Sequence, residues 1–171
     1  DRTVAQLADA EVDGILLFDP MNVMYVTYAP NMQVWLLHNQ ARYAFVGADG
    51  TLILFDYPGC EFLSAHNQFV TEVRPARTFT YFLAGDRIDE QSKVFAQEIA
   101  DAARAHGMGS RRIAVDSSTT VGITSLLDQG LTLVEGTQIM EEARKIKGPD
   151  EIRAMRCSVD ATFVSCHRMF E

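Results

Sequence analysis

The sequence predicts an α/β fold: a mixed sheet of five to six strands with helices on both faces, followed by a C-terminal helix. Short apolar runs alternate with longer segments of helical periodicity, which is the order of elements in α/β proteins. Asp49 and Gly50 lie between two apolar runs, and such a pair tolerates the positive φ that a tight antiparallel hairpin requires. Crossover helices together with one hairpin indicate a mixed rather than a fully parallel sheet.

The first elements are predicted to be a helix, a buried strand and a second helix. Residues 4–10 have apolar side chains at helical spacing, and residues 14–18 form a continuous apolar run typical of a strand buried on both faces. Asp19 and Pro20 end this strand. The same pair suits the start of a helix over residues 21–27, because Asp caps free N–H groups and Pro has none to leave unpaired.

The middle of the chain is predicted to supply the hairpin and its neighbours. Strands are expected at residues 34–37 and 42–46, and residues 51–55 should return antiparallel to residues 42–46 after the turn. Beyond the hairpin, residues 58–65 are predicted to be helical and residues 69–73 to form another strand.

A long amphipathic helix dominates the second half of the chain. Residues 88–106 place apolar side chains on one side and charged ones on the other, and Gly107 marks the end of the helix. The remaining predicted elements are strands at residues 113–115 and 131–134, a helix capped by Ser117 or Ser118 and running to about residue 129, and a helix at residues 137–145. Asp116 follows a strand directly, so a capping role is preferred for it over a catalytic one.

Residues 145–156, with the sequence KIKGPDEIRAMR, join two segments of different character. Gly148 and Pro149 stop the preceding helix, and Pro149 suits the first position of a new one. The new helix has an apolar stripe at steps of three and four residues: Ile152, Met155, Val159, Phe163, Cys166 and Phe170. Residues 1–146 are therefore expected to form one domain, and residues 147–171 a linker helix whose stripe needs a partner.

This junction resembles that of the creatinase, prolidase and aminopeptidase P superfamily, in which a small N-terminal domain precedes a metal-binding pita-bread domain. D-P-M-N-V-M-Y-V-T at residues 19–27 and R-I-A-V-D at residues 112–116 extend the likeness. Two stretches are most similar to the dimethylsulfoniopropionate lyase branch: N-M-Q-V-W…H-N at residues 31–39, and the segment from E-G-T-Q-I-M to I-R-A-M-R at residues 135–156. The resemblance covers essentially the whole chain, but only the first domain of the family.

The resemblance implies a function that depends on a second domain, missing from this sequence. In the family the metal ligands are two aspartates, a histidine and two glutamates, all in the second domain. Zn, Fe or Mn is therefore expected there, and no metal or cofactor is expected in these 171 residues. The resemblance also implies a homodimer that acts on a small-molecule or dipeptide substrate, by metal-assisted hydrolysis or, in the lyase branch, by base-promoted elimination.

Motifs for an independent active site are absent from the sequence, and no catalytic residue is assigned. There is no H-E-x-x-H, no paired C-x-x-C, no G-x-S-x-G and no two aspartates eleven positions apart. An independent enzyme with an unrecognised site is therefore the weakest of three hypotheses. An accessory domain of a metal-dependent enzyme is favoured over a stand-alone binding or oligomerisation module, because the stripe of the last helix would otherwise be bare.

Trp35, His38, Asn39 and Arg42 form the candidate substrate-binding cluster. In the family this part of the first domain leans over the active site of the partner subunit, so the resemblance implies that these residues help to close that site. Arg42 offers a bidentate contact to a carboxylate, and Trp35 offers a ring face to a sulfonium or ammonium cation. The alternative is structural: Trp35 in the core, Arg42 on the surface of a strand, and His38 bonded to backbone in a turn.

Charge and composition disfavour several classes of partner. Fifteen basic and 23 acidic residues give a net charge of −8, which disfavours nucleic acid or an anionic membrane. No apolar run approaches the roughly 18 residues of a membrane span.

The cysteine content indicates the compartment. The sequence has an odd number of cysteines, Cys60, Cys157 and Cys166, and two of them lie on one predicted helix, so a disulfide framework is disfavoured. A reducing, cytoplasmic location is therefore expected. The sequence begins at Asp1 rather than Met, so a removed signal segment stays open.

Overall fold

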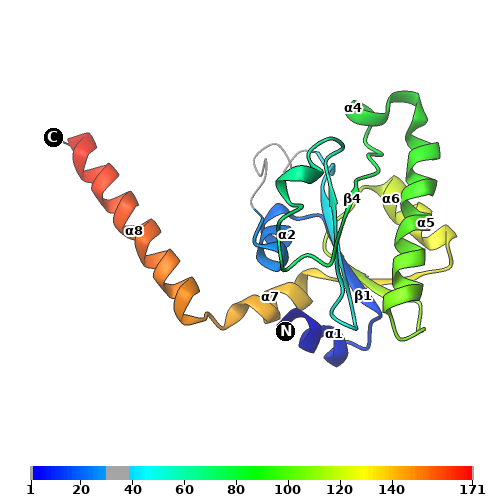
Figure 1. The fold of residues 1–171 in the computed structure, drawn as a ribbon, viewed down its shortest axis with the longest axis horizontal. Helices are drawn as coiled ribbons and strands as arrows, with labels where there is room; N and C mark the ends of the chain where they lie inside the picture. The colour runs from blue at the N-terminus through cyan, green and yellow to red at the C-terminus, as the bar shows by residue number, and fades with distance from the viewer. Residues whose placement is uncertain (1, 30–38, 171) are drawn as a thin grey trace.

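A mixed six-stranded sheet forms the centre of the computed structural model, which describes residues 2–29 and 39–170 (Figure 1). The strands lie in the order β4-β3-β2-β1-β5-β6. Their bounds are β1 Gly14–Leu17, β2 Tyr43–Gly47, β3 Leu52–Asp56, β4 Glu72–Pro75, β5 Arg112–Val115 and β6 Thr132–Glu135. β1 pairs parallel with β5 and antiparallel with β2, so the predicted mixed sheet is confirmed.

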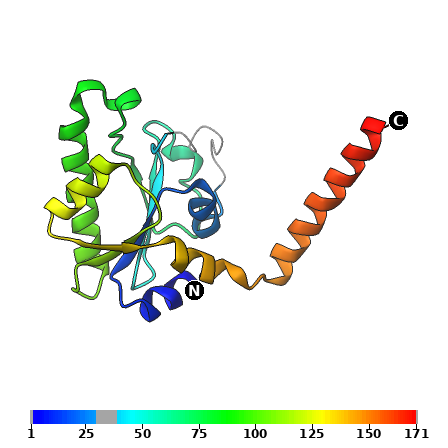
Figure 2. The ribbon, with the colours of Figure 1, turned by 180° about the vertical axis from the view of Figure 1, so that it is seen from behind.

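Helices cover both faces of this sheet. α5 and α6 lie on one face, and α1, α2 and α7 lie on the other, as the two opposite views show (Figures 1 and 2). The bounds are α1 Arg2–Asp9, α2 Pro20–Thr27, α4 Tyr81–Ala84, α5 Ile88–His106, α6 Thr120–Asp128, α7 Thr137–Lys145 and α8 Pro149–Phe170, with short 3-10 turns η1 Glu61–Leu63 and η2 Gly85–Arg87. The helices predicted over residues 88–106 and 137–145 therefore have the bounds that were expected.

The central strand β1 divides the hydrophobic core into two layers. Leu16 points to the α5 side and packs in one cluster with Phe95. Ile15 and Leu17 point to the opposite face, where they share a cluster with Leu7 of α1. Successive side chains of a strand alternate between faces, so a strand covered by helices on both sides must be apolar throughout. This is why the uninterrupted apolar run in the sequence predicted a fully buried strand.

β2 and β3 form the hairpin that the Asp-Gly turn predicted. Tyr43 lies opposite Phe55 and Val46 lies opposite Leu52. The Gly47 N–H donates to the Thr51 carbonyl at 2.8 Å, which leaves residues 48–50 as the turn, and Gly50 in it has a φ of 87°, the left-handed conformation that glycine adopts most readily.

The caps of the helices agree with the prediction at α2 and differ at α6. The Asp19 carboxylate accepts hydrogen bonds from two backbone N–H groups in the first turn of α2, as predicted. At α6 the Thr119 hydroxyl accepts the Gly122 N–H at 3.3 Å. The predicted cap by Ser117 or Ser118 is wrong, because the backbone is still extended at Thr119, with a ψ of 157°.

The segment between β3 and β4 is less regular than predicted. An α-helix was predicted over residues 58–65, but only the short turn η1 forms, and Gly59 before it has a φ of 89°, which an α-helix excludes. The strand predicted at residues 69–73 begins later, as β4. The Asn67 side chain accepts the N–H of Phe69 at 2.9 Å and holds the backbone there in a turn, which delays pairing with β3.

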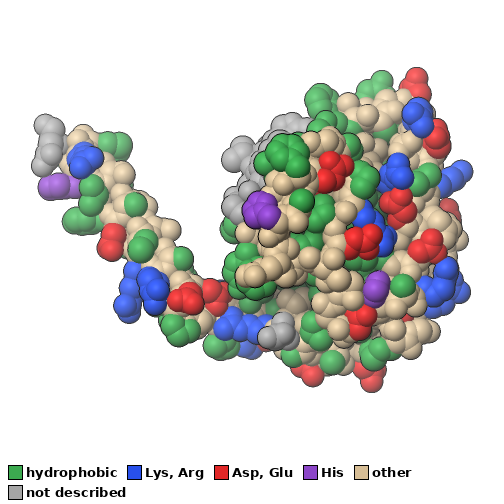
Figure 3. All heavy atoms as spheres, viewed as in Figure 1, with side chains coloured by type: hydrophobic (Ala, Val, Ile, Leu, Met, Phe, Trp, Pro, Cys, Tyr) green, Lys and Arg blue, Asp and Glu red, His purple; other side chains and the backbone are tan. Residues whose placement is uncertain are grey.

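α8 begins at Pro149, as predicted, and extends away from the sheet (Figure 1). None of its residues is buried. The apolar stripe is open to solvent, with Val159 66% and Phe163 71% exposed, and hydrophobic side chains lie along the helix in the space-filling view (Figure 3). Within the described residues, no helix is both long and apolar enough to cross a membrane.

Candidate functional site

The predicted substrate-binding cluster falls partly outside the described residues. Trp35 and His38 lie outside them, as does the strand predicted at residues 34–37. Asn39 is half-buried, and Arg42 lies just before β2 with only 2% of its surface exposed. The alternative interpretation of Arg42 as a surface residue is therefore wrong. An arginine is fully buried only where its charge is paired.

Arg42 is paired with Asp56, the last residue of β3. The Arg42 Nε donates to Asp56 Oδ1 at 3.1 Å, and both side chains are almost completely buried. Asp56 also accepts from the Ser64 hydroxyl at 2.7 Å and from the Tyr57 N–H at 2.9 Å. Burial lowers the pKa of the Arg42 guanidinium, and the Asp56 carboxylate acts in the opposite direction. The Arg42 Nη2 atom is buried and has no hydrogen-bond partner among the described residues.

The partner of Arg42 was not identified from the sequence, although a signal for it exists. In the observed register Tyr43 faces Phe55, so one step further along the hairpin Arg42 faces Asp56. Counting outward from a three-residue turn at residues 48–50 gives the same pairing. A two-residue turn would have placed Tyr57 opposite Arg42 instead, so the exact turn length decides which residue meets the buried charge.

A surface hollow of about 590 Å³ lies beside this ion pair. Its wall includes Ser64, whose hydroxyl connects the hollow to Asp56. The rings of Tyr28 and Phe69 lie 5.2 Å apart at its edge, and 69% and 56% of the two residues is exposed. The lining residues are Tyr28, Ala29, Leu63, Ser64, His66, Asn67, Gln68 and Phe69. Neither ring was singled out in the sequence, because the two rings are 41 positions apart and only the fold brings them together.

Asp116 serves the domain as a hydrogen-bond acceptor at the end of β5. Its carboxylate accepts the N–H groups of Phe18 at 2.7 Å and Asp19 at 3.1 Å, and the side-chain N–H of Asn22 at 2.9 Å. Burial raises the pKa of Asp116, and these donors offset part of the rise. The expected capping role is thus corrected: Asp116 fixes the neighbouring chain between β1 and α2, while Thr119 caps the helix that follows Asp116.

A metal site does not fit the residues that the structure describes. Residues 2–29 and 39–170 contain no group of three or more His, Cys, Asp or Glu side chains placed to hold a metal ion. His66 is exposed at the hollow, and His106 contacts Asp49 at 3.0 Å on another part of the surface. His167 stacks against Phe163 on α8. No step of a metal-dependent reaction is therefore assigned to these residues.

The architecture is that of the N-terminal domains of pita-bread peptidases. The structure resembles the N-terminal domain of the cytoplasmic peptidase PepQ from Mycobacterium tuberculosis, with a TM-score of 0.55 and 18% identity over 84% of this chain and 95% of that one. It also resembles the prolidase from Pyrococcus horikoshii, with a TM-score of 0.58 and 15% identity over 89% of this chain and 36% of that one. At these identities the likeness establishes the fold.

The family follows from the sequence match. A model of the Creatinase/Prolidase N-terminal domain matches residues 1–146, and the chain belongs to this family. Two curated relatives are dimethylsulfoniopropionate lyases named DddP. The one from Roseobacter denitrificans is 42% identical over 91% of this chain, and the one from Roseovarius nubinhibens is 40% identical over 99% of it. The chain spans only 35% and 38% of the length of these two relatives.

Proposed function

We propose that this chain acts as the non-catalytic N-terminal domain of a metal-dependent lyase or hydrolase, where it helps to close the substrate site and contributes to a homodimer. The observation that carries the proposal is the match of residues 1–146 to the Creatinase/Prolidase N-terminal domain, together with relatives about three times as long as the region they share with this chain. In this proposal the catalytic Zn, Fe or Mn is held by another domain, and residues 147–171 are the helix that leads to it.

The proposed reaction is that of the lyase relatives rather than that of the peptidases. The two lyases share 42% and 40% of their aligned residues with this chain, whereas the two peptidases share 18% and 15%. The substrate class is then a small carboxylate-bearing sulfonium compound, and a dipeptide is the second candidate. We place the protein in the cytoplasm, without a nucleic acid or membrane partner, in keeping with its net charge of −8.

The alternative function is a stand-alone binding or oligomerisation module. The length of the native gene product distinguishes the two, because the accessory role requires a second domain and the alternative does not.

The proposed substrate contacts come from Trp35, His38, Asn39 and Arg42. Arg42 supports this through its Nη2 atom, a buried donor without a partner among the described residues, because a contact with an anionic group would satisfy that donor. Asn39 lies three positions from Arg42 and is half-buried. The hollow beside Ser64 adds the exposed rings of Tyr28 and Phe69, which suit a cationic group.

The first prediction concerns these contacts in the longer protein proposed here. Arg42→Lys keeps a cation next to Asp56 but removes the second guanidinium nitrogen. We expect Arg42→Lys to lower kcat/KM by roughly 10- to 150-fold, which corresponds to the loss of one charge-assisted hydrogen bond of about 1.5–3 kcal/mol to the substrate. Trp35→Ala should also lower kcat/KM, and Trp35→Phe should recover part of the loss because an aromatic face remains. The measurement is steady-state kinetics with dimethylsulfoniopropionate, and the metal content should not change.

The control for this prediction is Arg74→Lys, which alters a half-buried arginine of β4 paired with Glu72 and should leave kcat/KM unchanged. Urea unfolding is measured for each variant, because a loss of folded protein would also lower the apparent activity. Full activity in Arg42→Lys, combined with simple unfolding in Trp35→Ala, would show that the cluster is structural.

The second prediction concerns self-association of the 171-residue chain. Burial of the stripe on α8 would stabilise a dimer by roughly 1.5–3 kcal/mol for each large apolar side chain, before the entropy of association is subtracted. We therefore expect a dimer in sedimentation velocity at micromolar concentration, and Val159→Glu or Phe163→Glu should shift it to monomer. Ala161→Glu, on the opposite face of the helix, is the matched control. A monomer at high micromolar concentration would contradict the proposal.

A further inference from the structure

The direction of α8 depends on a few contacts at its first turn. No residue of the helix is buried, and in both ribbon views it extends away from the sheet (Figures 1 and 2). At a rise of 1.5 Å per residue its 22 residues span about 33 Å, so a rotation of about 20° at the joint would move the far end by about 11 Å. Whatever fixes the joint therefore decides where the far end of α8 lies.

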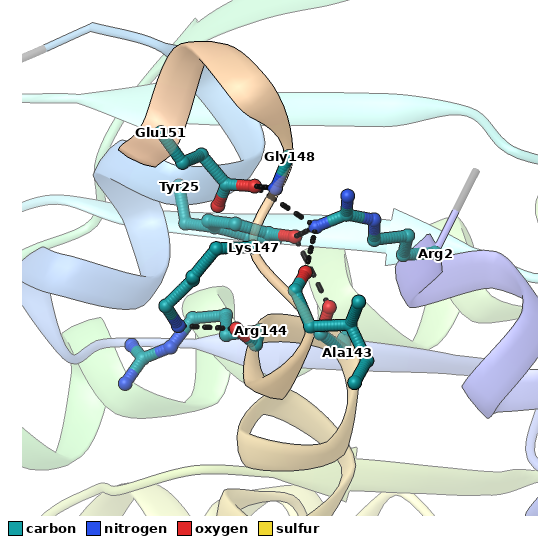
Figure 4. Close-up of polar contacts among 8 residues, drawn as sticks. Arg2, Tyr25, Ala143, Arg144, Lys147, Gly148 and Glu151 are labelled. Carbon is teal, nitrogen blue, oxygen red and sulfur yellow. Dashed lines mark hydrogen bonds and ion pairs between the residues drawn. The ribbon is translucent and has the colours of Figure 1, made fainter. Parts of the chain in front are cut away.

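Arg2 of α1 bridges the two sides of this joint (Figure 4). Its Nη1 donates to the carbonyl oxygen of Ile146 at 2.6 Å, just after α7, and to Glu151 Oε2 at 3.0 Å, in the first turn of α8. The Tyr25 hydroxyl of α2 is a third, longer contact of the same nitrogen at 3.5 Å. One guanidinium from the start of the chain thus connects the end of α7 with the start of α8.

Glu151 also caps the N-terminus of α8. The Glu151 carboxylate accepts the Gly148 N–H at 2.6 Å, and the Gly148 carbonyl accepts the first helical N–H, from Ile152, at 3.0 Å. This is the return half of a capping box, in which the third helical residue bonds to the N-cap backbone. A Cβ added at Gly148 would lie 3.3 Å from Glu151 Oε2 and 3.4 Å from Arg2 Nη2, so the N-cap backbone lies directly against both ends of the bridge. The Gly148 N–H, followed by Arg2, lowers the pKa of Glu151, which is ionised at neutral pH.

The domain side of the joint is anchored to the sheet. The Tyr25 hydroxyl donates to the carbonyl oxygen of Ala143 in α7 at 3.2 Å. Arg144 of α7 donates to Asn22 Oδ1 at 2.6 Å, and Asn22 in turn donates to Asp116 at the end of β5. α7 is therefore held against α2 and the sheet, and the backbone between α7 and α8 is the place where the direction of α8 can change.

Without the Arg2 bridge, different directions of α8 would have nearly the same free energy. The ion pair is partly exposed, with 42% and 32% of the two side chains accessible, and exposed pairs contribute little to overall folding stability. However, a helix with no buried residue has no packing energy with which to prefer one direction. A bridge that forms in only one direction can then select it, even when its loss would leave the fold intact.

We propose that Arg2 is a positioning residue that sets the direction in which α8 leaves the domain. The consequence for a longer protein rests on the proposed function: Arg2 would then orient this domain relative to a catalytic domain that follows α8. The direction of α8 itself does not depend on that function and can be measured in the 171-residue chain.

Native cysteines provide the probes for this third prediction. Cys60 lies in the domain and Cys166 lies near the end of α8, and both are at least partly exposed. In a background with Cys157→Ser and with Val159→Glu, which is expected to keep the chain monomeric, spin labels on Cys60 and Cys166 report the direction of the helix by pulsed electron spin resonance. We expect one narrow distance distribution with Arg2 present and a broader, shifted one for Arg2→Ala. Glu151→Ala should broaden the distribution as well, since it removes the other end of the bridge.

Arg153→Ala is the matched control, because Arg153 is an exposed arginine on the same turn whose ion pair lies within α8, with Asp150 at 3.5 Å. Its distance distribution should remain that of the parent chain. Circular dichroism and thermal unfolding check that every variant is folded. A broad distribution in the parent chain, or an unchanged one in both Arg2→Ala and Glu151→Ala, would overturn the proposal. These distances require neither activity nor metal, so a failure of the proposed function would leave them unaffected.

Discussion

Asp56→Ala is expected to lower the free energy of unfolding by about 3–5 kcal/mol, because it leaves the guanidinium of Arg42 buried without its counter-charge. The Ser64 hydroxyl and the Tyr57 N–H lose their acceptor at the same time. The measurement is urea unfolding of the 171-residue chain at pH 7, followed by circular dichroism. Asp56→Asn should cost less, since an amide oxygen can still accept one of these hydrogen bonds.

Two further variants separate charge pairing from other effects at this site. Glu72→Ala breaks a partly exposed ion pair with Arg74 on the adjacent strand and should cost no more than about 1 kcal/mol. Arg42→Met combined with Asp56→Leu removes both buried charges, and it should be less destabilising than Asp56→Ala because no isolated charge remains. A cost for Asp56→Ala as small as that for Glu72→Ala would mean that Arg42 reaches water or another anion once Asp56 is gone.

Asp13→Ala is expected to lower the free energy of unfolding by about 2–4 kcal/mol, because several backbone donors then lose a charged acceptor. The Asp13 carboxylate accepts the N–H groups of Met108 at 2.8 Å, Ser110 at 3.2 Å and Arg111 at 2.6 Å. These bonds hold the turn between α5 and β5, where Arg111 has a φ of 59°. The measurement is again urea unfolding at pH 7. Glu11→Gln, at an exposed carboxylate near Asp13 in the chain, is the control and should stay within about 0.5 kcal/mol.

The effect of Asp13 should depend on pH in a defined direction. Burial raises the pKa of Asp13, but the three backbone donors outweigh it and hold the pKa below its ordinary value. A carboxylate with a lower pKa in the folded state contributes stability above its unfolded pKa of about 3.9, and this stability is lost as the pH falls through the folded pKa. The difference between the parent chain and Asp13→Asn should therefore shrink below about pH 4. A difference that stays constant down to pH 2 would contradict this account.

The sequence predicted best those elements whose signal is local and repeated. The helix over residues 88–106 and the buried strand near Ile15 were predicted because a periodic apolar face, or an uninterrupted apolar run, is written in adjacent positions. The junction at Gly148 and Pro149 was also predicted locally, and it led to the family to which the chain belongs. Predictions were weakest between β3 and β4, where the left-handed Gly59 and an Asn67 turn decide the backbone without any periodicity.

The sequence by itself determined the α/β class, the family and the position of the last helix, since each of these follows from patterns that are local in the chain, such as apolar periodicity and short motifs, read in the order in which they occur. Only the tertiary structure decided which distant groups meet. Asp13 accepts hydrogen bonds from a turn 95 to 98 positions away, and Arg2 contacts Glu151 across 149 positions. Arg42 is buried against Asp56 rather than exposed, because the hairpin register brings a counter-charge to it. Hydrogen bonds and ion pairs form between groups that the whole fold brings within about 3 Å, and a local pattern does not carry that information.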